Sequence, residues 1–173
     1  PLAYLDGPGG TQVPQQVIDA VSDYYRQHNA NHGGAFVTSR ESDAMVRESR
    51  ETLAAFLGAP SWRDISYGAN MTTLTYALSH ALGRAMEPGD EVVITALDHE
   101  ANRGPWLGLR ERGVVVKEVG LLHDATLDPE GMAEQIGPRT KLVAIGYASN
   151  AFGTVNDVEL ARDLAHEVGA YVV

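Results

Sequence analysis

Residues 91–102 read Glu91-Val92-Val93-Ile94-Thr95-Ala96-Leu97-Asp98-His99-Glu100-Ala101-Asn102, and they indicate the class of fold. Val92, Val93 and Ile94 are apolar at successive positions, so a strand here would be buried on both of its faces. Strands of this kind are typical of parallel sheets that helices cover on both sides. The polar run that begins at Asp98 would then follow the carboxyl end of the strand, where ligands bind in open α/β sheets.

Outward from this strand, short β-rich segments alternate with helical segments from Ile65 to the end of the sequence. The alternation predicts a three-layer α/β/α fold with a mainly parallel sheet. The expected strands are residues 65–67, 91–96, 114–119, 141–147 and 170–173. The expected helices are residues 70–84, 105–112, a short helix that begins near Asp128, and residues 158–168.

The first sixty residues show a helical pattern instead. A helix is expected after Pro14, because apolar side chains recur on one face at Val17, Val21, Tyr24 and Tyr25. Thr38 and Glu41 have the spacing of a capping box and predict a second helix that ends near Leu57.

These patterns divide the chain into two expected parts. Residues 1–60 form a helical segment that borders the active site, and residues 61–173 form the first part of an α/β domain. The final strand has no closing turn or helix after it, so we expect Val173 to be a truncation point.

Composition narrows the function classes. Of the 173 residues, 44% are hydrophobic and 21% are charged, as in folded globular proteins. The net charge of −10 argues against nucleic-acid binding, which needs basic side chains to displace counterions. The sequence has no cysteine, which excludes disulfides and thiolate metal sites within it. No apolar run is long enough to span a bilayer, so a cytoplasmic protein without membrane contact is expected.

A small-residue loop, Tyr67-Gly68-Ala69-Asn70-Met71-Thr72-Thr73, leads into one expected helix. Its small residues allow a ligand to approach the backbone, and a helix start offers unpaired N–H groups to an anion. Asn70 would cap the helix or bind phosphate, although a plain capped loop is the simpler interpretation of this segment alone. The sequence has neither a Walker lysine motif nor a G-x-G-x-x-G motif, which disfavours ATP and dinucleotides.

Two further polar loops follow expected strands. His99 suits an acid/base, a metal ligand or a flat surface against a ring, but no second histidine has ligand spacing, so no metal site is expected. The alternative for His99 is simple exposure. Ser149 and Asn150 end another strand, and the alternative there is an Asx-turn that satisfies its own backbone. Together the three loops predict a phosphate site, a flat ring and an amide at one edge of one sheet.

The order and spacing of these motifs resemble the class V aminotransferase superfamily of fold-type I pyridoxal 5'-phosphate (PLP) enzymes, most closely its cysteine desulfurase-like branch. The strongest matches are Asp98-His99-Glu100-Ala101-Asn102 with Pro105-Trp106, and Ser149-Asn150-Ala151-Phe152-Gly153-Thr154. The last of these is similar to the family's Ser-Asn-x-x-Gly-Thr. Tyr4-Leu5-Asp6, Asn29-Ala30-Asn31 and the Gly68–Thr73 loop also match. The resemblance covers nearly all 173 residues.

The resemblance implies part of the large domain of the PLP-transferase fold type I, and it implies roles for several residues. His99 would stack on the pyridine ring of PLP and assist proton transfers, which makes it the expected catalytic residue. Asn70 and Met71 would lie at the phosphate, with Met71 contributing its backbone N–H. Asn150 would lie near the 3-hydroxyl of PLP and the carboxylate of the substrate.

The same resemblance implies which parts lie elsewhere. Gly9 and Gly10 align with a loop at the substrate entrance, whereas Gly33 stands where many desulfurases carry a histidine. The aspartate that keeps the pyridine protonated, the lysine that binds PLP and the arginine that pairs with the substrate would follow Val173. Lys117 and Lys141 do not fit the family's lysine motif and are interpreted as charges that flank strands.

The function implied is a PLP-dependent carbon–sulfur lyase that acts on cysteine or selenocysteine and passes sulfur to an enzyme cysteine beyond Val173. A homodimer, a small amino-acid substrate and a sulfur-acceptor protein are the expected partners. The alternatives are another class V enzyme (an epimerase, an aminotransferase or a kynureninase-like hydrolase) and a non-catalytic binding fragment. A Rossmann-type nucleotide binder is disfavoured because its glycine motif is missing.

Overall fold

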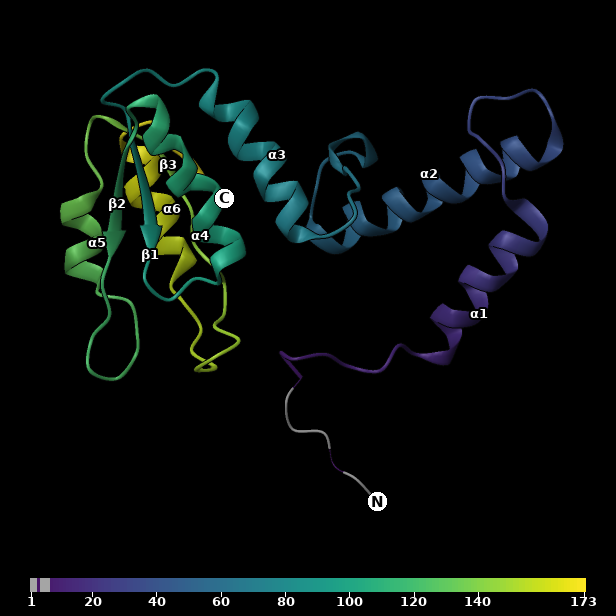
Figure 1. Ribbon diagram of the computed structural model, residues 1–173, viewed down its shortest axis with the longest axis horizontal. Helices are drawn as coiled ribbons and strands as arrows, with labels where there is room; N and C mark the ends of the chain where they lie inside the picture. The colour runs from purple at the N-terminus through teal and green to yellow at the C-terminus, as the bar shows by residue number, and fades with distance from the viewer. Residues whose placement is uncertain (1–2, 4–6) are drawn as a thin grey trace. The chain divides into compact units, whose positions relative to one another are not determined.

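The computed structural model describes residue 3 and residues 7–173, so the predicted Tyr4-Leu5-Asp6 motif lies outside the described residues. The chain divides after Tyr67 into two compact units, and each is described by itself (Figure 1). We call residues up to Tyr67 the helical unit and Gly68–Val173 the sheet unit. The functional boundary expected after residue 60 stays a prediction.

The helical unit contains the two helices that the sequence predicts. Helix α1 spans Gln15–Asp23 and continues as a π-helical turn, η1, over Tyr24–His28. Helix α2 spans Val37–Leu57, and a 3-10 turn, η2, follows at Trp62–Asp64.

The start of α2 corrects one prediction. The residue that caps it is Phe36, and no side chain makes a capping hydrogen bond there. Thr38 lies inside the first turn, so the capping box predicted from Thr38 and Glu41 is wrong. The Glu41 carboxylate instead lies 2.8 Å from Nδ1 of His28, because the chain folds back and brings η1 beside α2.

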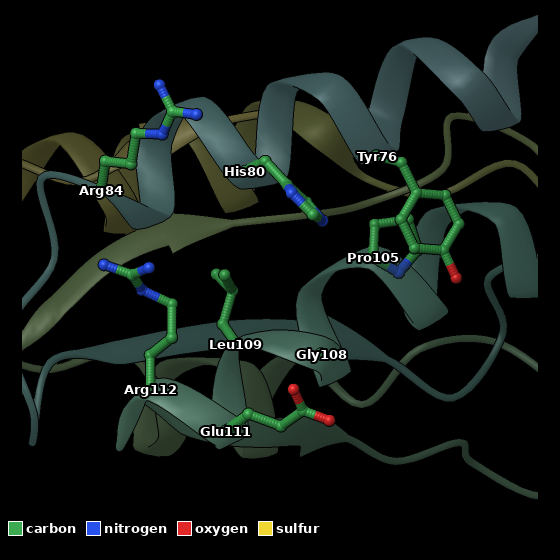
Figure 2. Close-up of a pocket in the computed structure, with 8 residues that line it drawn as sticks. All are labelled: Tyr76, His80, Arg84, Pro105, Gly108, Leu109, Glu111 and Arg112. Carbon is green, nitrogen blue, oxygen red and sulfur yellow. The ribbon is translucent and has the colours of Figure 1, made fainter.

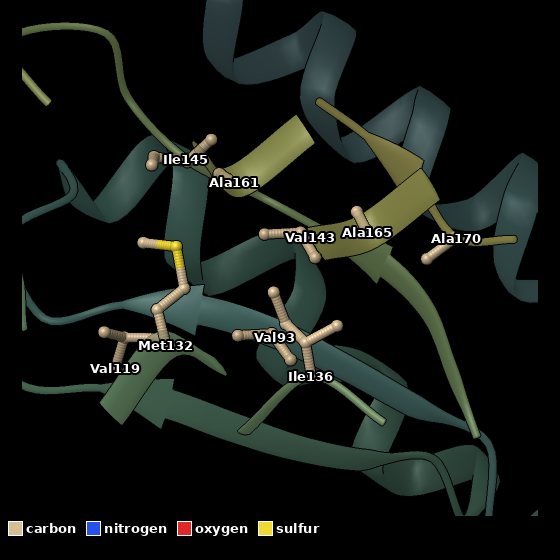
Figure 3. Packing of buried hydrophobic residues seen from close by; sticks show 9 residues of the cluster. All are labelled: Val93, Val119, Met132, Ile136, Val143, Ile145, Ala161, Ala165 and Ala170. Atoms are coloured by element: carbon tan, nitrogen blue, oxygen red, sulfur yellow. The ribbon is translucent and has the colours of Figure 1, made fainter. Parts of the chain in front are cut away.

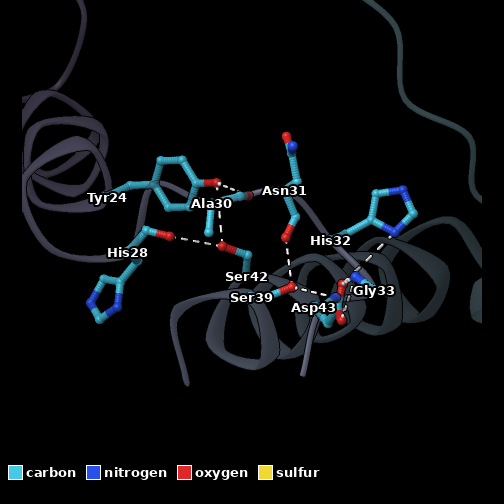
Figure 4. Close-up of polar contacts among 10 residues, drawn as sticks. Tyr24, His28, Ala30, Asn31, His32, Gly33, Ser39, Ser42 and Asp43 are labelled. Carbon is cyan, nitrogen blue, oxygen red and sulfur yellow. Dashed lines mark hydrogen bonds and ion pairs between the residues drawn. The ribbon is translucent and has the colours of Figure 1, made fainter. Parts of the chain in front are cut away.

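Buried serines join α2 to the loop that precedes it (Figure 4). The Ser39 hydroxyl accepts a hydrogen bond from the Gly34 N–H (2.7 Å) and donates to the carbonyl of Asn31 (2.6 Å). The Ser42 hydroxyl donates to the carbonyl of His28 (2.9 Å). These bonds satisfy loop groups that no regular structure would satisfy, and they fix the loop on the helix.

The sheet unit confirms the α/β prediction. Its strands are β1 (Glu91–Thr95), β2 (Val115–Val119), β3 (Thr140–Val143) and β4 (Tyr171–Val172). They lie in the order β2-β1-β3-β4, and every pair is parallel. The helices are α3 (Met71–Gly83), α4 (Glu100–Leu107), which continues as the 3-10 helix η3 (Gly108–Arg112), α5 (Pro129–Gln135) and α6 (Val158–Glu167).

Side-chain caps explain where three of these helices begin. Oδ1 of Asn70 accepts from the backbone N–H of Thr73 at the start of α3 (2.9 Å). Asp128 caps α5 and Asp157 caps α6 in the same way. An oxygen at this position satisfies one of the N–H groups that the first turn leaves free.

Both faces of the sheet are covered, because β1 is buried along its whole length. On one face Val93 packs with residues of α5, α6, the neighbouring strands and the segments that adjoin them (Figure 3): Val119, Met132, Ile136, Val143, Ile145, Ala161, Ala165 and Ala170. On the other face Val92 and Ile94 pack with residues of α4, η3 and the neighbouring strands: Trp106, Leu109, Val114, Leu142 and Ala144. Helices α5 and α6 cover one face, and α4 with η3 covers the other, where α3 packs against α4. The sheet therefore lies between two helical layers, as predicted.

Three elements differ from the sequence prediction. The strand expected at 141–147 is β3, which ends at Val143. The expected strand at 65–67 has extended backbone at Ile65 but pairs with no strand of the described residues. The helix expected at Pro105 begins five residues earlier, at Glu100, with Pro105 inside it. Proline favours a first turn, which made residue 105 resemble a start, but the cap is supplied by His99. Across residue 3 and residues 7–173, no helix has the length and apolarity that a membrane span requires.

Candidate functional site

A hollow of about 260 Å³ lies at the carboxyl edge of the sheet. Its walls come from the start of α3, from the loop after β1 and from the loop after β3. Met71, His99 and Asn150 all line it, so the structure brings together residues from all three predicted loops. We call it the carboxyl-edge hollow.

His99 caps α4 with its own ring. Its Nδ1 accepts a hydrogen bond from the backbone N–H of Ala101 (3.1 Å), and the side chain is otherwise exposed. Because Nδ1 acts as the acceptor, the neutral ring carries its proton on Nε2. The local turn thus fixes both the position of the imidazole and the nitrogen that is left to exchange a proton.

The start of α3 is arranged to receive an anion. Oδ1 of Asn70 is occupied by Thr73, accepting from its N–H (2.9 Å) and from its hydroxyl (3.0 Å). The first-turn N–H groups of Met71 and Thr72 have no partner within the helix, and the helix dipole favours negative charge there. Asn70 therefore acts as the cap, and Met71 is the residue of this pair that lines the hollow.

The loop after β3 holds its shape through Ser149. The buried Ser149 hydroxyl accepts from the N–H groups of Ala151 and Phe152, each at 3.2 Å. The Ser149 carbonyl accepts from Gly153 N–H (2.9 Å), and Gly153 has a positive φ of 75° that favours glycine. The turn is therefore made by the serine. The Asn150 carboxamide has no hydrogen-bond partner among the described residues and remains available at the hollow.

Three polar residues of the hollow received no role from the sequence: Asp98, Asn102 and Asn156. Asp98 directly precedes His99, and Asn102 lies in the first turn of α4. Asn156 is buried, and its amide donates to the carbonyl of Gly146 (2.6 Å). The sequence does not single out Asn156, because its burial and its hydrogen bond to Gly146 become apparent only in three dimensions.

The donor set of the hollow fits PLP. First-turn N–H groups suit the phosphate, a flat imidazole suits the face of a pyridine ring, and a free carboxamide suits a hydroxyl or carboxylate oxygen. Gly9 and Gly10 belong to the helical unit, so their role at the substrate entrance stays a prediction. Among the described residues, no three acidic or histidine side chains gather where they would hold a metal ion.

A second hollow, of about 380 Å³, lies between the end of α3 and the helix formed by α4 and η3 (Figure 2). Arg84, which follows α3, and Arg112 of η3 lie at one end of it, and His80 lies further along α3 toward Tyr76. Of the matched motifs it contains Pro105, but none of the residues to which the resemblance assigns a catalytic or cofactor-binding role. It is therefore separate from the carboxyl-edge hollow, which Met71, His99 and Asn150 line.

Comparisons with known proteins agree with this geometry. The aminotransferase class-V family model matches residues 3–173. The chain is 38% identical over 179 residues to a probable cysteine desulfurase of Mycolicibacterium paratuberculosis, which covers 100% of this chain and 26% of that protein. It is 35% identical over 176 residues to a cysteine desulfurase of Haloferax volcanii, covering 99% of this chain and 41% of that one.

Solved structures give the same match. The apo cysteine desulfurase of Thermococcus onnurineus NA1 has a TM-score of 0.90 and 27% identity, over 98% of this chain and 42% of that one. The cysteine desulfurase CsdA of Escherichia coli has a TM-score of 0.80 and 27% identity, over 92% and 41%. The chain spans between 26% and 44% of the length of the curated relatives that it matches.

Proposed function

This chain belongs to the aminotransferase class-V family, and we propose that it forms the N-terminal part of a PLP-dependent cysteine desulfurase-like enzyme. The proposed enzyme is a cytoplasmic homodimer that takes sulfur from a small amino acid and passes it to an acceptor protein. The observation that carries the proposal is the carboxyl-edge hollow, which joins Met71, His99 and Asn150 from three separate loops.

Each of these residues has a task that its contacts support. The first-turn N–H groups at Met71 and Thr72 would hold the phosphate of PLP, and the Asn70 side chain keeps that turn in place. His99 would lie against the face of the pyridine ring. The free carboxamide of Asn150 would donate to the 3-hydroxyl oxygen or to the substrate carboxylate.

When bound, PLP supplies an electron sink for the carbanion that forms when an amino acid loses its Cα proton. The chain's own part in proton transfer falls to His99. Its Nδ1 is engaged by the Ala101 N–H, so Nε2 is the nitrogen that would hold or move a proton. The same bond keeps the ring from rotating away.

The test uses the full-length protein, purified with PLP and supplied with L-cysteine and a reductant. We expect His99→Ala to lower the rate of sulfide release by about 10²-fold or more, because a positioned acid/base contributes that much, and to weaken PLP retention. His123→Ala is the matched control, since His123 is an exposed loop histidine outside the hollow. Equal turnover and equal PLP content in the wild type and His99→Ala would remove His99 from the site. A wild type that releases no sulfide from cysteine would refute the proposed reaction.

A further inference from the structure

Asp98 lies directly before His99 and is tied to both ends of the His99 loop. The hydroxyl of Thr95 donates to Oδ2 of Asp98 (2.6 Å), and the side-chain amide of Asn102 donates to Oδ1 (3.3 Å). Thr95 is fully buried and Asn102 is only 7% exposed. Both donors are therefore fixed, and the carboxylate clamps the loop at a point before His99 and at a point after it.

Backbone bonds reinforce this clamp. The N–H of Asp98 donates to the carbonyl of Thr95 (3.4 Å), and the N–H of Asn102 donates to the carbonyl of His99 (2.8 Å). The His99 ring itself has one hydrogen-bond partner among the described residues, the N–H of Ala101. The direction of the imidazole thus depends on the turn, and the turn depends on Asp98.

The Asp98 carboxylate also touches the opposite wall of the hollow. A Cβ atom at Gly146 would lie 2.5 Å from Oδ1 of Asp98, which is closer than real Cβ atoms approach. Gly146 is not among the glycines with positive φ, so its backbone conformation does not demand glycine. The requirement is steric: the carboxylate occupies the space that a side chain at residue 146 would need.

Asn156 holds the Gly146 wall in place through two hydrogen bonds. Its amide donates to the carbonyl of Gly146 (2.6 Å), and its backbone N–H donates to the carbonyl of Tyr147 (2.9 Å). Asn156 is 8% exposed, and these two hydrogen bonds hold it in place. The segment that leads to Asn150 is therefore held at Gly146, the residue against which Asp98 rests.

We infer that Asp98 is a positioning residue, whose carboxylate holds the His99 loop against Gly146 and so sets the gap between His99 and Asn150. The inference rests on the proposed function, because that gap is where the planar PLP ring would lie. Asp98 acts through its two hydrogen-bond donors and its contact with Gly146, and it has no part in the chemistry itself. A flat ring needs a slot of fixed width, and small displacements of a catalytic group are costly.

The experiment measures the PLP dissociation constant of the full-length protein by absorbance titration, alongside its kinetics with L-cysteine. We expect Asp98→Ala and Gly146→Ala each to weaken PLP binding by about tenfold or more, since both displace the His99 loop. The loss should appear in kcat more than in KM for cysteine, because Asp98 does not bind the substrate.

Asp98→Asn should restore most of the binding. Its carbonyl oxygen accepts from Thr95, and the Asn102 amide, once rotated, accepts from its NH₂ group. In NMR spectra of Asp98→Asn the His99 ring should keep the wild-type Nε2–H tautomer, whereas Asp98→Ala should lose it. Failure of Asp98→Asn to restore binding would overturn the hydrogen-bonding role.

The chain offers a matched control elsewhere. A Cβ at Gly131 would lie 2.7 Å from Oδ2 of Asp128, which caps α5 outside the hollow. Asp128→Ala and Gly131→Ala should therefore lower thermal stability but leave PLP binding within about twofold of the wild type. If they weaken PLP binding as much as the Asp98 and Gly146 variants do, the positioning role is refuted. Wild-type affinity in Asp98→Ala refutes it as well, while a wild type that binds no PLP refutes the proposed function.

Discussion

Glu91, the first residue of β1, has a buried carboxylate: its side chain is only 4% exposed. Nζ of Lys117 lies 2.6 Å from Oε2, and Arg139 lies 2.9 Å from Oε1. Burial raises the pKa of this carboxyl, but the hydrogen bonds and positive charges of Lys117 and Arg139 together lower it below its ordinary value of 4.5. Lys117, interpreted from sequence as a charge that flanks a strand, therefore neutralises a buried acid.

Glu91 makes stability depend on pH in a defined direction. Its pKa is lower in the folded chain than in the unfolded chain, so its contribution is complete above 4.5 and is lost as the pH falls through the folded value. We expect Glu91→Gln to lower the free energy of unfolding by about 2 kcal/mol at neutral pH, because Lys117 loses a charged partner. The difference from wild type should shrink well below pH 4.5. Urea unfolding at both pH values measures it.

The matched control is the other lysine. Nζ of Lys141 lies 3.7 Å from Asp90, and its side chain is 49% exposed. Exposed ion pairs contribute little, so Lys141→Met should change the free energy of unfolding by less than about 1 kcal/mol. If Glu91→Gln and Lys141→Met had equal effects, or if the effect of Glu91→Gln did not depend on pH, the assignment of the buried pair would be wrong.

At the scale of the elements, the turn between η3 and β2 depends on one glycine. Gly113 has a φ of 82°, and a Cβ there would lie 2.9 Å from the ring of Pro88. Its carbonyl accepts from the N–H of Gly89 (2.9 Å), so the turn cannot move away freely. We expect Gly113→Ala to lower the free energy of unfolding by about 1–3 kcal/mol, from left-handed strain plus the contact with Pro88.

Gly108 provides the comparison for Gly113. It lies in the same helical segment with a φ of −60°, and a Cβ there would meet no atom within 4 Å. Gly108→Ala should stabilise the protein by up to about 1 kcal/mol through helix propensity. Thermal and urea unfolding of the two variants should therefore move in opposite directions. A shift of the same sign in both would contradict this account of the turn.

The elements also show which features of the fold could be predicted from sequence. The strand β1 was predictable because three successive apolar residues, Val92, Val93 and Ile94, indicate burial on both faces. Helix α5 was predictable from its Asp128 cap. The expected strand at 65–67 was wrong because a strand needs a partner, and residue type alone does not supply one. Local sequence patterns predict an element correctly when burial or a helix cap determines it, and they fail when strand pairing determines it.

The candidate site divides in the same way. The three loops were predictable, because each follows an expected strand and carries polar residues. The contact between Asp98 and Gly146 was not, since 48 residues separate them and only the pairing of β1 with β3 brings them together. The sequence also could not show that Ser149 closes the turn and leaves Asn150 free, because either residue can close such a turn.

At the scale of the whole molecule, the ammonium groups of the two lysines of the sequence are held toward the amino-terminal end of β1, away from the carboxyl-edge hollow. Lys117 is bound to Glu91, at the start of β1, and Lys141 lies beside Asp90. The carboxyl-edge hollow begins after Thr95, at the other end of β1. Lys117 pairs with Val93 in the middle of the strand, but its ammonium group is bound at Glu91, and β1 spans roughly 13 Å from Glu91 to Thr95 at about 3.3 Å per residue.

The proposed function requires a lysine that binds PLP covalently, and we therefore expect it to lie outside these 173 residues. Borohydride reduction of the full-length protein with bound PLP, followed by peptide mass spectrometry, should place the modified lysine in another part of the protein. Replacing both Lys117 and Lys141 by arginine should leave the PLP content unchanged, because arginine keeps the ion pairs with Glu91 and Asp90. A reduced adduct on Lys117 or Lys141, or loss of PLP from the double variant, would mean that the carboxyl-edge hollow is not where PLP reacts.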